Sequence, residues 1–241
     1  MMSRYKDLFN FRDLGGLRTK DQKKVKSGLV YRTGNISHLT EETAEFLVEK
    51  LEIKTYIDFR GKNEIQEFGE PKVLLSAGIE WVNIHIEADD PDFAKISHPQ
   101  PKDWVQLYVR LFEKNKAGWA QFLKIIQESK KPLMYGCLFG KDRTGIGTGL
   151  LLDRLSVEKN EIIKDYSKTT EGLFPNVEKL SKIWQNTKLT EEEVAEHYLK
   201  AHPEILSGFL DHYLDSSHQN FQMVVGNAQQ LDEGLRKKLI E

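Results

Sequence analysis

Apolar and polar positions show two kinds of pattern along the first half of the chain, helical spacing and short strand-like apolar runs. Apolar residues spaced three and four apart predict two amphipathic helices, over 104–112 and 119–126, with stripes typical of core faces. Thr40, followed by two glutamates, is typical of a helix N-cap and predicts another helix that extends to about Leu51. Runs rich in apolar and β-branched residues predict short strands over 28–32, 53–59, 79–86 and 133–135.

Beyond about Ser156 the pattern is helical to the end of the sequence. Strands that alternate with helices, with a ligand loop at the carboxyl end of one strand, predict an α/β layer arrangement. We therefore expect one domain over 1–241, with an α/β core over 1–155. Residues 156–241 are expected to form a helical extension, either a cap on that core or a lid.

The composition is typical of a globular enzyme, since 39% of the 241 residues are hydrophobic and 30% are charged. A net charge of −2 gives no global basic field, so we expect no nucleic-acid partner and only a local attraction for phosphate. No apolar run approaches the roughly 20 residues of a membrane helix, and the first residues lack the apolar run of a secretory signal. The single cysteine excludes an intrachain disulfide, and a reducing compartment, the cytoplasm, is expected.

The most informative segment follows the predicted strand over 133–135. It reads Gly-Cys-Leu-Phe-Gly-Lys-Asp-Arg-Thr-Gly over 136–145, and a leucine-rich helix comes after it. A strand–loop–helix points backbone N–H groups into one concavity above the positive end of the helix, which suits a phosphate. Arg143, six positions after Cys137, can hold two phosphate oxygens with its planar fork. The same positive pocket would stabilise the thiolate of Cys137, a nucleophile that needs no separate base.

Two other interpretations of this segment are weaker. A nucleotide-binding Walker loop would need a different glycine spacing, and Ser or Thr where Asp142 stands. A lone cysteine is normally a small buried core residue. The compound string over 137–145, between a strand and a helix, nevertheless favours a chemical role for Cys137.

Three ordered motifs carry a family resemblance. They are the loop over 137–145, the segment Asn-Phe-Arg-Asp-Leu-Gly-Gly over 10–16 with Tyr-Arg-Thr-Gly over 31–34, and Tyr-Ile-Asp-Phe-Arg over 56–60. Together they resemble the atypical bacterial tyrosine phosphatases, a family of tyrosine/serine and phosphoinositide phosphatases. The resemblance implies an α/β cysteine-phosphatase fold with a central, largely parallel sheet flanked by helices. It also implies that Cys137 is the nucleophile, that Arg143 clamps the phosphate, and that no metal or other cofactor takes part.

One position departs from the family pattern. The family usually has histidine directly before the cysteine, and this chain has Gly136. The missing imidazole would remove hydrogen bonds that orient the loop, and glycine would free the backbone where rigidity is wanted. Lower activity, a different pH optimum or a narrower range of substrates is expected to follow.

The leaving oxygen needs a proton, so a carboxylic acid is expected near the loop. Asp142 is the first candidate because the loop itself presents it, and the resemblance also favours it. Asp58, at the end of a predicted strand, is the second, although it could equally pair with Arg60 or Arg12. Acidic residues after the strand over 79–86 rank third, namely Asp89, Asp90 and Asp92.

The other residues expected at the site bind phosphate or support the loop. Lys141 is expected at the rim, where a lysine resembles those of lipid phosphatases that meet a second phosphate on an inositol ring. An ordinary solvent-facing lysine is the other interpretation. The phosphate-binding set comprises Leu138, Phe139, Gly140, Lys141, Asp142 and Arg143, and the supporting set comprises Arg12, Asp13, Arg60 and Thr144.

The expected function is hydrolysis of phosphate monoesters through a cysteinyl-phosphate intermediate. Phosphotyrosine is the expected substrate, with phosphoserine, phosphothreonine or phosphoinositides as further ones, so the partner is a phosphorylated protein or a phosphoinositide. A phosphate-binding pseudophosphatase is the main alternative, and only Gly136 favours it. A sulfurtransferase also uses a loop cysteine after a strand, but it has no need for Arg143 as a phosphate clamp.

Overall fold

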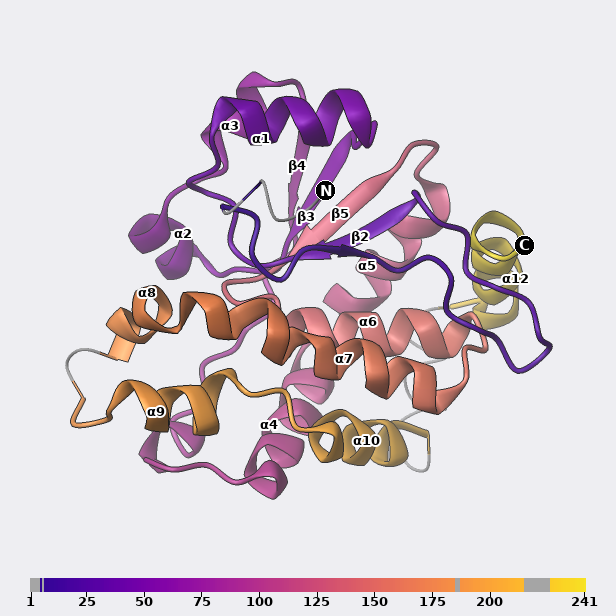
Figure 1. The fold of residues 1–241 in the computed structure, drawn as a ribbon. Helices are drawn as coiled ribbons and strands as arrows, with labels where there is room; N and C mark the ends of the chain where they lie inside the picture. The colour runs from indigo at the N-terminus through magenta and orange to yellow at the C-terminus, as the bar shows by residue number, and fades with distance from the viewer. Residues whose placement is uncertain (1–4, 6, 185–186, 215–225) are drawn as a thin grey trace.

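A computed structural model of the chain describes residue 5 and residues 7–184, 187–214 and 226–241. A five-stranded sheet forms its centre, in the order β1-β2-β5-β3-β4 (Figure 1). The inner pairs β2–β5, β5–β3 and β3–β4 are parallel, and β1 runs antiparallel to β2 at one edge. The strands are β1 (Arg12–Asp13), β2 (Val30–Thr33), β3 (Thr55–Asp58), β4 (Glu80–Asn83) and β5 (Leu133–Gly136).

The register of the parallel strands sets the place of the site. Gly136, the last residue of β5, pairs with Thr33 of β2 on one side and with Asp58 of β3 on the other. The carboxyl ends of three strands therefore meet at one edge of the sheet. In open α/β sheets, ligands bind in the crevice outside that edge.

The four predicted strands are confirmed, each within a few residues of its expected bounds. The predicted largely parallel sheet is also confirmed. The two-residue β1 was not predicted, because its Arg-Asp sequence has no apolar alternation and it forms only by pairing with β2.

The predicted helices are present as well. Thr40 caps α1 through its hydroxyl, which accepts the backbone N–H of Thr43 at 3.3 Å. Between β1 and the phosphate loop lie α1 (Glu41–Glu45), η2 (Phe46–Lys50), α2 (Lys62–Phe68), α3 (Lys72–Ser76), η3 (Phe93–Lys95), α4 (Pro101–Lys114) and α5 (Lys116–Glu128).

The C-terminal third is helical wherever the structure describes it, apart from connecting loops and short terminal pairings. The elements after the phosphate loop are α6 (Asp142–Arg154), α7 (Lys159–Leu173), η4 (Phe174–Asn176), α8 (Val177–Ser181), η5 (Lys182–Trp184), α9 (Glu191–Val194), η6 (Ala195–Leu199), α10 (Pro203–His212) and α12 (Ala228–Leu239). No helix within the described ranges is long and apolar enough to cross a bilayer.

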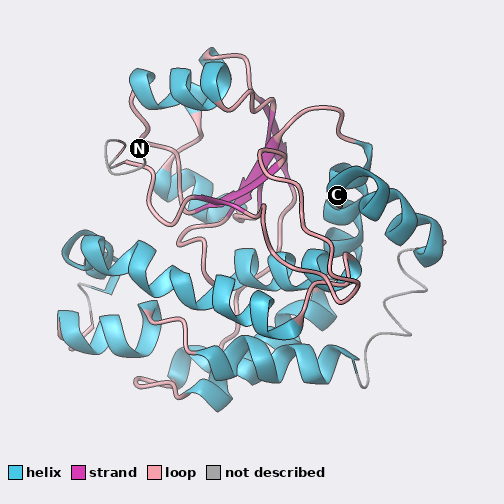
Figure 2. Cartoon of the chain, turned by 45° about the vertical axis from the view of Figure 1, so that its right-hand side comes forward, coloured by secondary structure: helices cyan, strands magenta, loops and turns pink. Residues whose placement is uncertain are grey.

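Helices cover both faces of the sheet (Figures 1 and 2). Successive strand residues point to opposite faces, so Ile57 and Tyr135 join one core cluster while Tyr56 and Met134 join another. The first cluster also contains apolar residues of α4, α5, α6, α10 and α12, and the second those of α1, η2 and α3. Residues on both sides of position 155 therefore share the larger core.

Candidate active site

The segment over 137–141 links β5 to α6 at the carboxyl edge of the sheet. Asp142 is the first residue of α6, so the loop lies at the positive end of that helix. Gly140 has a φ of +67°, and a Cβ there would lie 2.5 Å from the carbonyl oxygen of Thr33. Only glycine fits this position, because both the left-handed backbone and the close approach of β2 exclude a side chain.

Gly136 is closely packed in the strand that precedes the loop. It is a buried residue of β5, and its carbonyl oxygen accepts the N–H of Phe59 at 2.8 Å. A Cβ at Gly136 would lie 2.6 Å from the carbonyl oxygen of Thr33, which is backbone and cannot yield cheaply. The absence of a side chain thus permits the close packing of β5 against β2.

The thiol of Cys137 lies at the end of β5 and is 2% exposed. The hydroxyl of Thr144, on the first turn of α6, donates a hydrogen bond to its sulfur at 3.2 Å. The structure thus places Thr144, a predicted support, against the proposed nucleophile.

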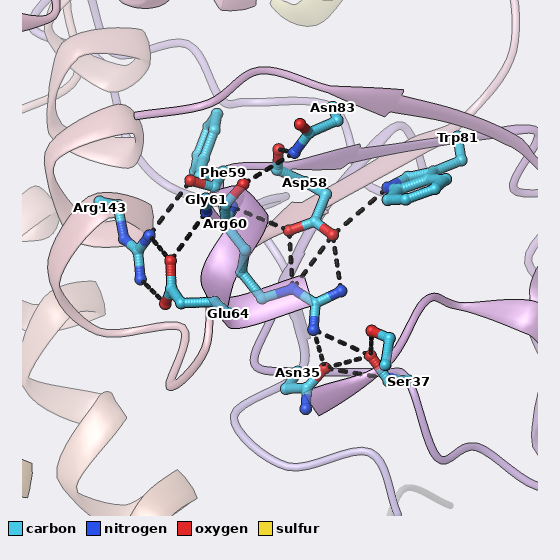
Figure 3. A network of polar contacts seen from close by, with 11 residues as sticks. Asn35, Ser37, Asp58, Phe59, Arg60, Gly61, Glu64, Trp81, Asn83 and Arg143 are labelled. Carbon is cyan, nitrogen blue, oxygen red and sulfur yellow. Dashed lines mark hydrogen bonds and ion pairs between the residues drawn. The ribbon is translucent and has the colours of Figure 1, made fainter. Parts of the chain in front are cut away.

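Arg143 is held in a two-point ion pair with Glu64 of α2 (Figure 3). Its Nη1 and Nη2 atoms lie 2.5 Å from the two carboxylate oxygens, and Nη1 also donates to the carbonyl of Phe59 at 3.2 Å. Burial by itself would lower the pKa of Arg143, but the hydrogen bonds and charge of Glu64 raise that pKa above its usual value. The guanidinium is therefore cationic and fixed in orientation at the end of the loop.

Sequence reasoning missed Glu64. A usable signal exists, because Glu64 is the third residue of a helix that begins directly after β3, at the same sheet edge as the loop. Its carboxylate accepts the N–H of Gly61 at 2.8 Å, as acidic residues in a first helical turn often do.

Asp58 and Arg60 form a fully buried pair (Figure 3). Both oxygens of Asp58 accept from Arg60, at 2.8–3.1 Å, and Trp81 donates to one of them at 3.3 Å. Arg60 then reaches Asn35 and Ser37, each at 2.9 Å. Asp58 therefore pairs with Arg60, which was one of the two interpretations from sequence. Through Arg60 it holds the segment that follows β2, and this role fits the contacts better than proton transfer does.

Asp142, the first-ranked acid, is 21% exposed. Its Oδ1 accepts a hydrogen bond from the hydroxyl of Tyr108 at 2.9 Å, and the hydroxyl of Tyr166 lies 2.7 Å from that of Tyr108. Burial, and then the charge of Asp142, raise the pKa of Tyr108 well above its usual value. Tyr108 therefore stays protonated and continues to donate to the carboxylate.

Lys141 is not at the rim, which corrects the expectation from sequence. Its side chain is 0% exposed, and its Nζ lies 3.8 Å from the ring centroid of Trp104. The ammonium donates to the carbonyl of Tyr198 at 2.5 Å and lies 3.5 Å from Asp142. Burial lowers the pKa of Lys141, and Asp142 partly opposes that shift. The reason for the difference is coverage by α4 and η6, which a local sequence pattern does not show.

The N-terminal motif holds the loop from the β2 side. Asn10 donates to the carbonyls of Phe139 and Gly140 at 3.0 and 2.9 Å, and Arg32 donates to that of Gly140 at 2.8 Å. Asn10 and Arg32 belong to motifs singled out from sequence, but no role was predicted for either.

Asp165 of α7 joins the two arginines of this motif. Its carboxylate lies 2.8 Å from Arg12 and 2.8 Å from Arg32, and it is 2% exposed. Burial alone would raise the pKa of Asp165, but the charges of Arg32 and Arg12 lower it. Burial and the nearby Arg32 lower the pKa of Arg12 to about 10. Arg12 thus supports the loop indirectly: it donates hydrogen bonds to Asp165 and to Asn10, and Asn10 contacts the loop.

Asp13 supports a different part of the fold. Its carboxylate accepts the N–H groups of Gly15 and Gly28, at 2.9 and 2.7 Å, and so closes the connection between β1 and β2. Two of the third-ranked acids are engaged as well, since Asp90 pairs with Arg110 at 2.6 Å and Asp92 with Lys95 at 2.8 Å. Among the described residues, no group of three or more His, Cys, Asp or Glu side chains could hold a metal ion.

Comparison with known proteins gives relatives of one kind. A Cupriavidus necator protein assigned as a tyrosine-protein phosphatase is 29% identical over 168 residues, which cover 67% of this chain and 60% of that protein. The tyrosine-protein phosphatase of Nostoc commune is 30% identical over 139 residues, which cover 56% of this chain and 46% of that protein. The chain thus spans about half of the length of these relatives.

Solved structures with weaker similarity were also found. One is the core catalytic domain of the PP-IP phosphatase SIW14 from S. cerevisiae, with 16% identity and a TM-score of 0.37, covering 88% of this chain and 93% of that one. The model of the "Tyrosine phosphatase family" matches residues 3–241, almost the whole sequence. The chain therefore belongs to the tyrosine phosphatase family.

Proposed function

We propose that this chain hydrolyses phosphate monoesters by way of a cysteinyl-phosphate, with phosphotyrosine as its main substrate. One observation carries the proposal: the sulfur of Cys137 accepts a hydrogen bond from Thr144 in the same loop that ends at an anchored, cationic Arg143. Membership of the tyrosine phosphatase family supports the same conclusion.

Phosphate binding falls to the loop and to the arginine. Backbone N–H groups over 138–143 and the N-terminus of α6 supply a concave, positive surface for the phosphate oxygens. The guanidinium of Arg143 adds a planar donor that follows the equatorial oxygens through the transition state. Glu64, Arg32 and Asn10 hold this surface in place before the substrate arrives.

The chemistry proceeds in two displacements. In the first, the Cys137 thiolate attacks phosphorus, an S–P bond forms and the P–O bond to the leaving group breaks, while Asp142 gives its proton to the departing oxygen. In the second, Asp142 takes a proton from water, the water oxygen attacks phosphorus and the thiolate leaves, which releases inorganic phosphate. We assign the acid to Asp142 rather than to Asp58, because Arg60 and Trp81 occupy both oxygens of Asp58.

Hydrolysis of p-nitrophenyl phosphate and of a phosphotyrosine peptide tests the proposal. We expect turnover that vanadate inhibits, that Cys137→Ser abolishes, and that Arg143→Lys reduces severely because lysine lacks the planar fork. Cys137→Ser should still bind the phosphopeptide, which separates loss of chemistry from loss of folding. Absence of turnover at every pH, with phosphopeptide binding retained, would instead identify a pseudophosphatase. Thiosulfate turnover that survives Arg143→Ala would identify a sulfurtransferase.

A further inference from the structure

A small apolar cavity lies beside the phosphate loop. Its volume is about 230 Å³. It opens where three segments meet, namely the chain after β2, the end of α2, and α8 with the adjoining η5. Its apolar lining consists of Phe9, Phe68, Leu138, Phe139, Leu180 and Ile183.

The cavity is continuous with the loop but separate from the reacting groups. Leu138 and Phe139, the two residues directly after Cys137, form part of its wall. Neither Cys137 nor Arg143 nor Asp142 lines it. A group bound here therefore belongs to a part of the substrate next to the phosphorylated residue, and not to the phosphate itself.

The volume limits the occupant. A cavity of about 150 Å³ lined by apolar side chains holds one benzene molecule, so about 230 Å³ suits one aromatic or branched aliphatic side chain. Drug-sized ligands and cofactors usually occupy about 300–1,000 Å³. A lipid acyl chain is too long for this space.

Charge at the cavity adds a second preference. Lys179 and Lys182 line it against one acidic residue, Glu67, and all three are exposed. His38 stacks on Phe9 with ring centroids 6.2 Å apart, and burial followed by the charge of Lys179 lowers the pKa of His38. This positive balance favours an acidic segment of chain around the bound apolar side chain.

We infer that this cavity is a specificity subsite for one large apolar side chain, leucine or phenylalanine, next to the phosphotyrosine of a peptide substrate. The inference rests on the proposed function and names its substrate class. A peptide is favoured over a phosphoinositide for two reasons. The cavity is too small for an acyl chain, and the ammonium of Lys141 is buried against Trp104, so it does not offer an exposed cation to a second ring phosphate.

Binding by the Cys137→Ser protein tests the subsite without requiring turnover. Fluorescence anisotropy would compare phosphotyrosine peptides that differ only by Leu or Ala at each position flanking the phosphotyrosine. We expect leucine at one position to tighten binding about tenfold or more, as burial of a few methylene groups in a fitted pocket does. In a Cys137→Ser, Ile183→Ser protein this Leu/Ala ratio should fall to near one.

Leu75→Ser is the matched control. Leu75 is 40% exposed and Ile183 is 38% exposed, but Leu75 lies on α3 and does not line the cavity. The Leu/Ala ratio should keep its original value in this control. Equal affinity for all peptides would overturn the inference, and so would a Leu/Ala ratio that Ile183→Ser leaves intact.

Two further outcomes are distinct. Tighter binding of a soluble inositol polyphosphate than of every peptide would overturn the choice of a peptide substrate. Absence of p-nitrophenyl phosphate hydrolysis by the unmodified enzyme, with the leucine preference retained, would sink the proposed catalysis and leave the subsite standing.

Discussion

Arg143 and Glu64 face each other in a two-point ion pair, with Nη1–Oε2 and Nη2–Oε1 distances of 2.5 Å. The pair joins the end of the phosphate loop to α2, the helix that follows β3. Because Glu64 fixes the fork in advance, less side-chain entropy is lost when a phosphate binds.

Glu64→Gln should lower kcat/KM about 10- to 100-fold, since a loosely held guanidinium is misplaced relative to the transition state. The free energy of unfolding should fall by about 2 kcal/mol, less than for a fully buried pair because Glu64 keeps 25% exposure. Urea denaturation and steady-state kinetics measure the two effects. Glu49→Gln, an exposed substitution on η2, should change neither.

The effect of Glu64 on stability should depend on pH. Burial by itself would raise the pKa of Glu64, but the hydrogen bonds and charge of Arg143 lower it below its usual value. A lowered folded-state pKa adds stability above the ordinary glutamate value of about 4.3, and this stability is lost as the pH falls through the folded-state pKa. The difference in unfolding free energy between wild type and Glu64→Gln should therefore narrow in acid. A constant difference from pH 7 down to pH 3 would contradict the ion-pair account.

Asp165→Asn should destabilise the protein by about 3–5 kcal/mol, because it leaves the buried guanidinium of Arg32 and the partly buried one of Arg12 without a counter-charge. The loop should also lose order, since Arg32 reaches the carbonyl of Gly140. Thermal unfolding and amide hydrogen exchange over 138–143 would detect both changes. As a control, Asp211→Asn removes an exposed partner of Lys159 and should cost less than about 1 kcal/mol. Equal costs for the two substitutions would refute a structural role for Asp165.

Tyr108→Phe should lower kcat on a phosphotyrosine peptide about 3- to 10-fold, because a misplaced acid is a poorer proton donor. The Tyr108 hydroxyl donates to Oδ1 of Asp142 and so fixes the orientation of the carboxyl group to which we assign the acid. Steady-state kinetics measure the effect. The comparison variant is Tyr166→Phe, which retains the hydroxyl of Tyr108 and should leave kcat near its original value. A loss of the same size in both variants would mean that packing, and not the hydrogen bond, is responsible.

Gly136→Ala should reduce stability by about 1–3 kcal/mol, since its Cβ would lie 2.6 Å from a backbone oxygen of Thr33. Gly136→His, which introduces the histidine that the family resemblance leads us to expect, should reduce stability further and should not raise activity. Gly149→Ala is the contrast, because a Cβ there meets only side-chain atoms at 3.4 Å in the middle of α6. Alanine in that helix should be neutral or stabilising by up to about 1 kcal/mol. Thermal unfolding of the variants measures these changes in stability. A stable, more active Gly136→His protein would contradict the prediction, because it would show that β2 can move away from residue 136.

Local sequence was sufficient for four of the five strands, for the loop and for the loop's own residues. The spacing of Cys137 and Arg143, the strand before them and the helix after them lie within a short stretch, where backbone preferences and hydrophobic periodicity act directly. The parallel sheet follows from the alternation of strands with helices, and the structure confirms it.

Only the tertiary structure determined which side chains contact the phosphate loop and which side chains are buried from solvent. Glu64 lies 79 positions from Arg143, and Asp165 lies 153 positions from Arg12, so no local pattern links them. The burial of Lys141 required α4 and η6 to cover it, although its neighbours in sequence predicted a rim position. The close contact of Thr33 with Gly136 likewise exists only once β2 and β5 are paired. Periodicity determines which face of an element is buried, whereas packing between distant elements determines the partner that each charge meets.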